Sequence, residues 1–104
     1  MLETPAGARY AGANVEFASY GLTQCAERAA LVRAVVDGER TFTRIAVARA
    51  DGEPIAPCGA CRQALAEFGT DLAVVFRTPA GLESRRLRAL LPEAFVLRED
   101  GRTD

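Results

Sequence analysis

The sequence contains 104 residues, 49% hydrophobic and 26% charged, and these ordinary globular values predict a single folded domain over 1–104 and exclude a disordered chain. Its 13 positive charges, all arginine, nearly balance 14 acidic residues, and the net charge of −1 argues against a protein that coats nucleic acid. No apolar stretch approaches the ~20 residues of a membrane span and no signal peptide opens the chain, so we expect a cytoplasmic protein with no nucleic-acid or membrane partner.

The first third of the chain predicts two short strands and a helix. Residues 1–7 are typical of a strand stub and a turn, and residues 8–15 of a short strand with Tyr10 and Val15 facing inward. Apolar residues at three- and four-residue spacing then predict a helix over 24–37. The residues expected to bound this helix are Thr23 or Gln24 near the N-cap and Gly38 after the last turn.

The remainder of the chain continues the alternation of strands and helices. The elements expected there are strands over 43–49, over 72–76 and near Leu82, and helices over 58–68 and 85–91. The continuous apolar run 72–76 is typical of a strand covered on both faces. This order predicts an α/β fold whose sheet is joined by helical crossovers, with cysteines at the starts of two helices.

Three cysteines carry most of the chemical information: Cys25, Cys58 and Cys61. An odd number without an export signal argues against a disulfide framework. Three thiolates make an incomplete tetrahedron around zinc, and the chain has no histidine or fourth cysteine to complete it. One position is then left for water, as in catalytic zinc sites. The absence of histidine and lysine also excludes Ser-His and Cys-His nucleophiles and Schiff-base lysines.

The cysteines stand in a two-part motif, Cys25-Ala26-Glu27 followed by Pro57-Cys58-x-x-Cys61. A His or Cys, any residue and Glu, then Pro-Cys-x-x-Cys, is the signature of zinc-dependent nucleobase deaminases. The segments 14–16, 18–22, 25–28, 57–63 and 90–95 resemble the cytidine deaminase family, and the resemblance runs from about residue 3 to residue 96. The chain is most similar to the small homotetrameric members, and blasticidin-S deaminases share much of the pattern.

The resemblance implies a three-layer α/β fold, a mixed sheet flanked by helices, with Zn²⁺ as cofactor. Cys25, Cys58 and Cys61 would be its ligands. Glu27 would be the catalytic proton shuttle in the hydrolytic deamination of cytidine and 2′-deoxycytidine to the uridines, with release of ammonia. Such an enzyme serves pyrimidine salvage, and a homo-oligomer, a tetramer in the family, is expected.

The resemblance also implies residues that contact the substrate. Asn14 and Glu16 would bind the ribose hydroxyls, and two residues apart on a strand they face the same side. The backbone of Ala26 would contact the base, and Phe95 would pack near it. Arg28 would donate a hydrogen bond to a ligand sulfur.

The chain departs from the family at its N-terminus and at Phe17. The resemblance implies that this chain lacks the family's leading helix and part of its first strand, which should expose one face and one edge of the sheet and remove part of the pyrimidine pocket. Phe17 replaces a usual asparagine, which could reshape the sugar side of the pocket.

Three alternative interpretations stay open. The substrate could be another aminopyrimidine nucleoside, such as blasticidin S. The chain could instead be a noncatalytic, zinc-stabilised binding module of deaminase-like fold. It could also be a dithiol redox protein, in which Cys58 and Cys61 form a reversible disulfide.

Overall fold

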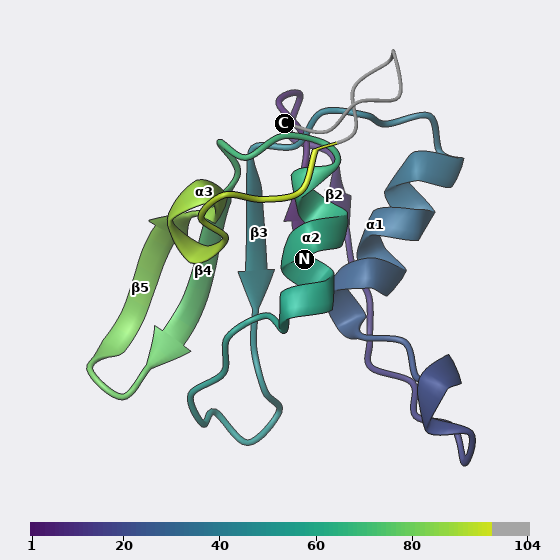
Figure 1. The fold of residues 1–104 in the computed structure, drawn as a ribbon, viewed down its shortest axis with the longest axis vertical. Coiled ribbons are helices and arrows are strands. Elements are labelled where there is room, and N and C mark those ends of the chain that lie inside the picture. The colour runs from purple at the N-terminus through teal and green to yellow at the C-terminus, as the bar shows by residue number, and fades with distance from the viewer. Residues whose placement is uncertain (97–104) are drawn as a thin grey trace.

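A five-stranded mixed sheet organises the chain, whose residues 1–96 are described by the structure, a computed structural model. Its spatial order is β2-β1-β3-β4-β5 (Figure 1). The strands are β1 (Leu2–Glu3), β2 (Arg9–Tyr10), β3 (Arg44–Val47), β4 (Ala73–Thr78) and β5 (Gly81–Arg86). Only β3 and β4 pair in parallel, and every other pairing is antiparallel. The mixed sheet with helices confirms the α/β fold predicted from the sequence.

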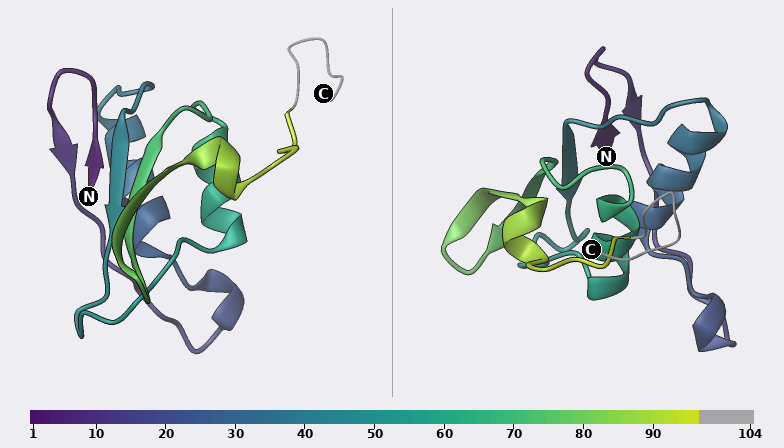
Figure 2. Two further views of the ribbon diagram at one scale, coloured as in Figure 1. Left: turned by 90° about the vertical axis from the view of Figure 1, so that its left-hand side faces the viewer. Right: turned by 45° about the horizontal axis from the view of Figure 1, so that its top comes forward.

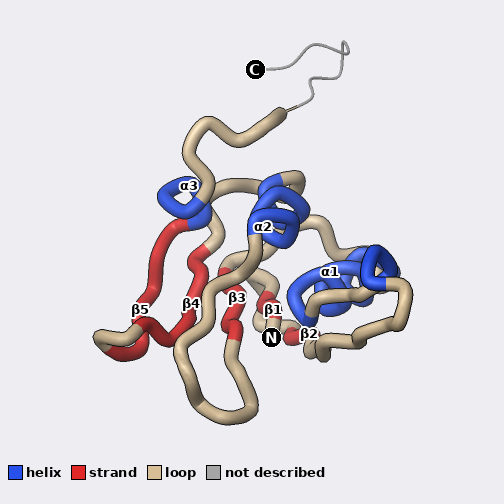
Figure 3. Tube along the Cα trace, turned by 60° about the horizontal axis from the view of Figure 1, so that its bottom comes forward, coloured by secondary structure: helices blue, strands red, loops and turns tan. Residues whose placement is uncertain are grey.

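The helices form a layer over one face of this sheet (Figure 2, left; Figure 3). They are α1 (Ala26–Val36), α2 (Gly59–Ala66) and the single turn α3 (Leu87–Leu90), and a 3₁₀ turn, η1 (Tyr20–Leu22), precedes α1. Helix α2 makes the crossover between the parallel strands β3 and β4. No helix within residues 1–96 covers the opposite face. None of these helices has the length and apolarity needed to cross a membrane.

The core lies between the sheet and the two longer helices. Buried side chains from the strands meet buried side chains from α1 and α2; the central members of this set are Ile45, Val47, Val74, Phe76, Ala30, Leu31, Ala34 and Leu65. Along β4, Val74 and Phe76 are buried, whereas Ala73 and Val75 are only half-buried. The prediction that this strand is covered on both faces was therefore wrong, because the helices occupy one face only.

Helix α1 begins later than its capping residues predicted. Its N-cap is Cys25 rather than Thr23 or Gln24. The backbone of Gln24 exchanges hydrogen bonds with that of Val15 at 2.9 Å in each direction, and this isolated antiparallel bridge holds Gln24 in an extended conformation. Val15 is 49% exposed, so the prediction that it faces inward was wrong. The buried position of Tyr10 was predicted correctly.

Strand β5 is longer, and α3 shorter, than the sequence pattern predicted. All six residues of β5 pair with β4 in an antiparallel hairpin closed by Pro79 and Ala80. The pairing extends through Arg85 and Arg86, which were expected to be helical. Ladder hydrogen bonds along the whole of β4 thus override the weak helical periodicity of 85–91.

Candidate metal centre and active site

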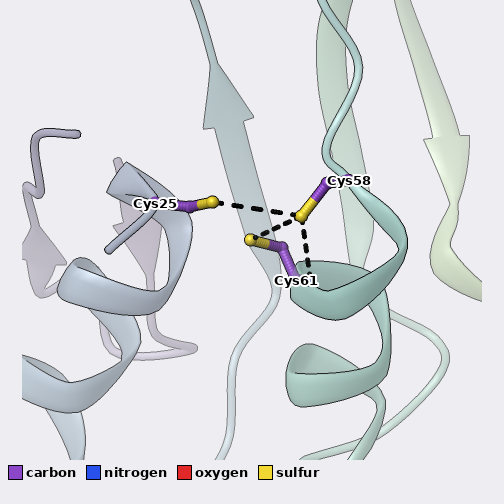
Figure 4. A group of neighbouring side chains, drawn as sticks. All are labelled: Cys25, Cys58 and Cys61. Carbon is purple, nitrogen blue, oxygen red and sulfur yellow. Dashed lines mark hydrogen bonds between the residues drawn. The ribbon is translucent and has the colours of Figure 1, made fainter. Parts of the chain in front are cut away.

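Two helix starts bring the three cysteine thiols together. Cys25 is the N-cap of α1, Cys58 is the N-cap of α2, and Cys61 lies in the first turn of α2 (Figure 4). The Sγ atoms are 3.9 Å apart for Cys25 and Cys58 and 3.4 Å apart for Cys58 and Cys61, and all three lie within 4.8 Å of one another. Sulfurs bound to tetrahedral zinc at 2.3 Å are about 3.8 Å apart. Both the donor set and its spacing therefore fit a zinc ion, and the cysteine cluster predicted from the sequence is present.

The environments of the two α2 thiols differ. The backbone N–H of Cys61 donates a hydrogen bond to the Sγ of Cys58 at 3.4 Å, and this bond lowers the pKa of the exposed Cys58 thiol below its ordinary value. Cys61 is fully buried, and burial raises the pKa of its thiol. A cation at the centre of the cluster would offset this desolvation, because a metal ion favours the thiolate form of its ligands.

Arg28 lies against the thiol cluster, as the resemblance implies. Its Nη2 donates to the Sγ of Cys25 at 3.5 Å, and its Nε is buried with no hydrogen-bond partner among residues 1–96. Hydrogen bonding to the thiols of Cys25 and then Cys61 raises the pKa of the Arg28 guanidinium. Three thiolates and one Zn²⁺ carry a net charge of −1, so a guanidinium beside the sulfurs offsets the surplus charge.

A cavity of about 820 Å³ opens beside the cluster. Glu27 lines it from the first turn of α1, next to Ala26, and Cys25 and Cys58 lie on its wall. A smaller cavity of about 290 Å³ shares Ala26 and Glu27 with the larger one and extends to Met1. Glu27, which the motif assigned to proton transfer, thus lines the same cavity as Cys25 and Cys58.

Asn14 also lines the larger cavity, together with Glu27, Cys25 and Cys58. Its Nδ2 donates to the Oε1 of Glu16 at 3.3 Å, so these two exposed side chains lie on the same side of the chain, as predicted. Glu16 itself does not line the cavity of the single chain. The extended backbone between them is held by the bridge of Val15 to Gln24.

Phe95 lies outside the cavity of its own chain. Phe95 is 59% exposed, and its carbonyl accepts a hydrogen bond from the Nε2 of Gln63 at 2.9 Å, which fixes the segment after α3 against α2. Its contact with the base stays a prediction. Phe17 is likewise exposed, and its backbone N–H donates to the Oγ1 of Thr23 at 3.3 Å.

Four residues near the site were missed by sequence reasoning. Gly12 lines both cavities, and Arg49 and Asp51, joined by an ion pair of 2.7 Å, line the larger one just beyond β3. Arg49 and Asp51 follow the carboxyl end of the parallel strand β3, and this position could have identified them, because such ends commonly carry binding residues. Arg62, next to Cys61, donates through Nε to the carbonyl of Pro57 and through Nη1 to that of Leu90.

The comparison with known families and structures agrees with this geometry. Residues 3–77 match the family described as "Cytidine and deoxycytidylate deaminase zinc-binding region". The chain belongs to the cytidine deaminase family. Its family explains the cluster directly, because zinc is the cofactor of this deaminase region and the three thiols supply a suitable ligand set.

Individual members of the cytidine deaminase family resemble most of the chain. It is 43% identical over 91 residues to the cytidine deaminase of Sporosarcina psychrophila and 46% identical over 87 residues to that of Halalkalibacterium halodurans. These alignments cover 86% and 82% of this chain but only 67% and 66% of the relatives, so the chain spans about two thirds of their length. The crystal structure of the Burkholderia pseudomallei cytidine deaminase matches with a TM-score of 0.81 at 46% identity, over 90% of this chain and 77% of that one. The Mycobacterium tuberculosis cytidine deaminase gives a TM-score of 0.81 at 38% identity, over 92% and 76%.

Proposed function

We propose that the chain catalyses the hydrolytic deamination of cytidine and 2′-deoxycytidine, forming the corresponding uridines and ammonia with Zn²⁺ as cofactor. The observation that carries this proposal is that Glu27 lines the same cavity as Cys25 and Cys58, two members of the three-thiol cluster. The names of the relatives support the substrate class.

Cys25, Cys58 and Cys61 would hold the metal, with the helix starts and Arg28 offsetting their negative charge. When bound, zinc supplies Lewis-acid activation of a water molecule. Glu27 moves the protons: it accepts one from water and donates it to N3 of the pyrimidine, and it then accepts the proton of the hydroxyl added at C4 and donates it to the amino group, which leaves as ammonia. One water is consumed and one ammonia is released, so the atoms balance.

The remaining contacts position the nucleoside. Asn14 and Glu16 bind the ribose hydroxyls, the Ala26 backbone contacts the base, and Phe95 packs near the base across a subunit boundary. The exposure of Phe95 supports such a contact between copies of the chain. We therefore propose a homotetramer that works in cytoplasmic pyrimidine salvage.

Replacing Glu27 by Gln tests this function, because the amide keeps the shape but cannot shuttle protons. We expect zinc to be retained at about one per chain and turnover of cytidine to fall by about 10²–10⁴-fold. The matched control is Glu67→Gln, which alters an exposed carboxylate at the end of α2 and should leave turnover unchanged.

Full activity of Glu27→Gln would contradict the mechanism. A zinc-loaded wild-type chain that neither turns over cytidine nor binds a tetrahydrouridine-type hydrate mimic would instead indicate a noncatalytic module. Faster turnover of blasticidin S than of cytidine would identify the other aminopyrimidine substrate.

A further inference from the structure

We propose that Gly12 is a positioning residue whose missing side chain sets the distance between the sugar-binding Asn14 and the helix start that carries Glu27. This inference rests on the proposed function, because it assigns Asn14 and Glu27 to opposite ends of one bound nucleoside. Gly12 would thus contribute to the site although it has no side chain and no functional group of its own.

The backbone at Gly12 lies against the first turn of α1. A Cβ built on Gly12 would be 2.3 Å from the carbonyl oxygen of Ala26, 2.6 Å from the backbone nitrogen of Ala30 and 3.1 Å from the Cβ of Ala29. The first two contacts are with backbone atoms, which cannot rotate away as a flexible side chain can. Gly12 does not have a positive φ angle, so the requirement for glycine here is steric and not conformational.

This close approach connects the sugar side of the proposed site, at Asn14, with the catalytic side, at Glu27. Gly12 lines both cavities together with Ala26 and Glu27, and Asn14 lies two residues further along the same segment. A side chain at position 12 would hold that segment away from α1 by about 1 Å, the difference between these contacts and normal van der Waals separation. Asn14 would move with it.

We expect residues 11–14, rather than helix α1, to shift when a side chain is added at position 12. Helix α1 is anchored by the buried side chains of Ala30, Leu31 and Ala34 and by the thiol cluster at its start. Residues 11–14 belong to no strand or helix. The metal ligands should therefore keep their places while Asn14 shifts.

The test compares Gly12→Ala with Gly21→Ala. Gly21 is exposed, has no positive φ, and a Cβ there would meet nothing within 4 Å, so its replacement is the matched control. For Gly12→Ala we expect kcat/KM for cytidine to fall about 10- to 100-fold, mainly through KM, because a misplacement of 1 Å can cost about 10²-fold. Zinc content should stay at that of the wild type.

A double-mutant cycle with Asn14→Ala separates positioning from general damage. If Gly12 acts by placing Asn14, Gly12→Ala should cost much less in the Asn14→Ala background than in the wild type. An equal loss in both backgrounds would overturn the inference, and so would a Gly12→Ala enzyme with the KM of the control.

A second variant covers the case in which Gly12→Ala does not fold. Ala29→Val adds volume to the same gap from the helix side, and we expect it to raise KM in the same way. An unchanged KM in the folded Ala29→Val enzyme would overturn the inference. Absence of cytidine turnover in the zinc-loaded wild type would instead refute the proposed function, and the inference would fall with it.

Discussion

Arg62 holds the segment that delivers Cys58 to the metal centre. Its guanidinium donates to the carbonyl of Pro57, immediately before Cys58, at 2.9 Å and to the carbonyl of Leu90, the last residue of α3, at 2.8 Å. Pro57 is fully buried. Replacing Arg62 by Ala would therefore remove both of these hydrogen bonds and leave the two carbonyls without this donor.

The expected loss of stability follows from the partial burial of these two hydrogen bonds. A buried acceptor left without a partner costs about 1–3 kcal/mol, and the carbonyl at the end of α3 can recover part of its loss from water. We expect Arg62→Ala to lower the free energy of unfolding by about 2–4 kcal/mol. Arg62→Lys should lose about half as much, because a single ammonium can reach one carbonyl but not both.

Urea denaturation at a fixed concentration of free zinc measures this difference, since bound metal adds to the stability of the folded state. Arg40→Ala is the matched control. Arg40 also donates to two carbonyls, those of Val35 and Glu39 at 3.1 and 2.9 Å, but it does so at the surface. Water can replace it there, so its loss should cost about 0.5 kcal/mol. Equal losses for Arg62→Ala and Arg40→Ala would refute the argument from burial.

Three further predictions concern the metal centre and the core. Arg28→Met should reduce zinc affinity or turnover about 10- to 100-fold, measured by chelator competition and cytidine assay, because the thiolates of Cys25 and Cys61 lose their cationic neighbour. The hydroxyl of Tyr10 donates to Asp37 at 2.6 Å, and this bond raises the pKa of Tyr10 from 10.0 to about 12. Its stabilising effect is present below pH 10 and lost as the pH rises to 12, so urea midpoints should fall more steeply over that range in the wild type than in Tyr10→Phe. Removal of zinc with a chelator should lower the urea midpoint, and zinc at 100 times its Kd should restore about 2.7 kcal/mol; an unchanged midpoint would show that the thiols hold no metal.

The metal ligands could be predicted from the sequence because their geometry is largely local. Cys58 and Cys61 are three residues apart at a helix start, and Cys25 and Glu27 occupy the cap and first turn of another helix. Such spacings determine which side chains point together once the helices form. The one long-range step, the meeting of the two starts, follows from the α/β order of the elements.

The features that were missed depend on contacts between distant segments. Thr23 is a better capping residue than Cys25, but the pairing of Gln24 with Val15 moved the start of α1. The contact of Arg62 with Leu90 joins residues 28 positions apart. The need for glycine at position 12 arises only when that segment meets α1, and no local signal marks it.

The ligand set also constrains the order in which the protein can be assembled. Cys25 and Cys58 are 33 residues apart in the chain, so a single ion bound by their sulfurs would link the starts of α1 and α2, two helices that also contact each other and share the core. During synthesis no complete site exists until Cys61 has left the ribosome. Metal capture by the complete ligand set therefore requires the first 61 residues, and it can precede the synthesis of β4, β5 and α3.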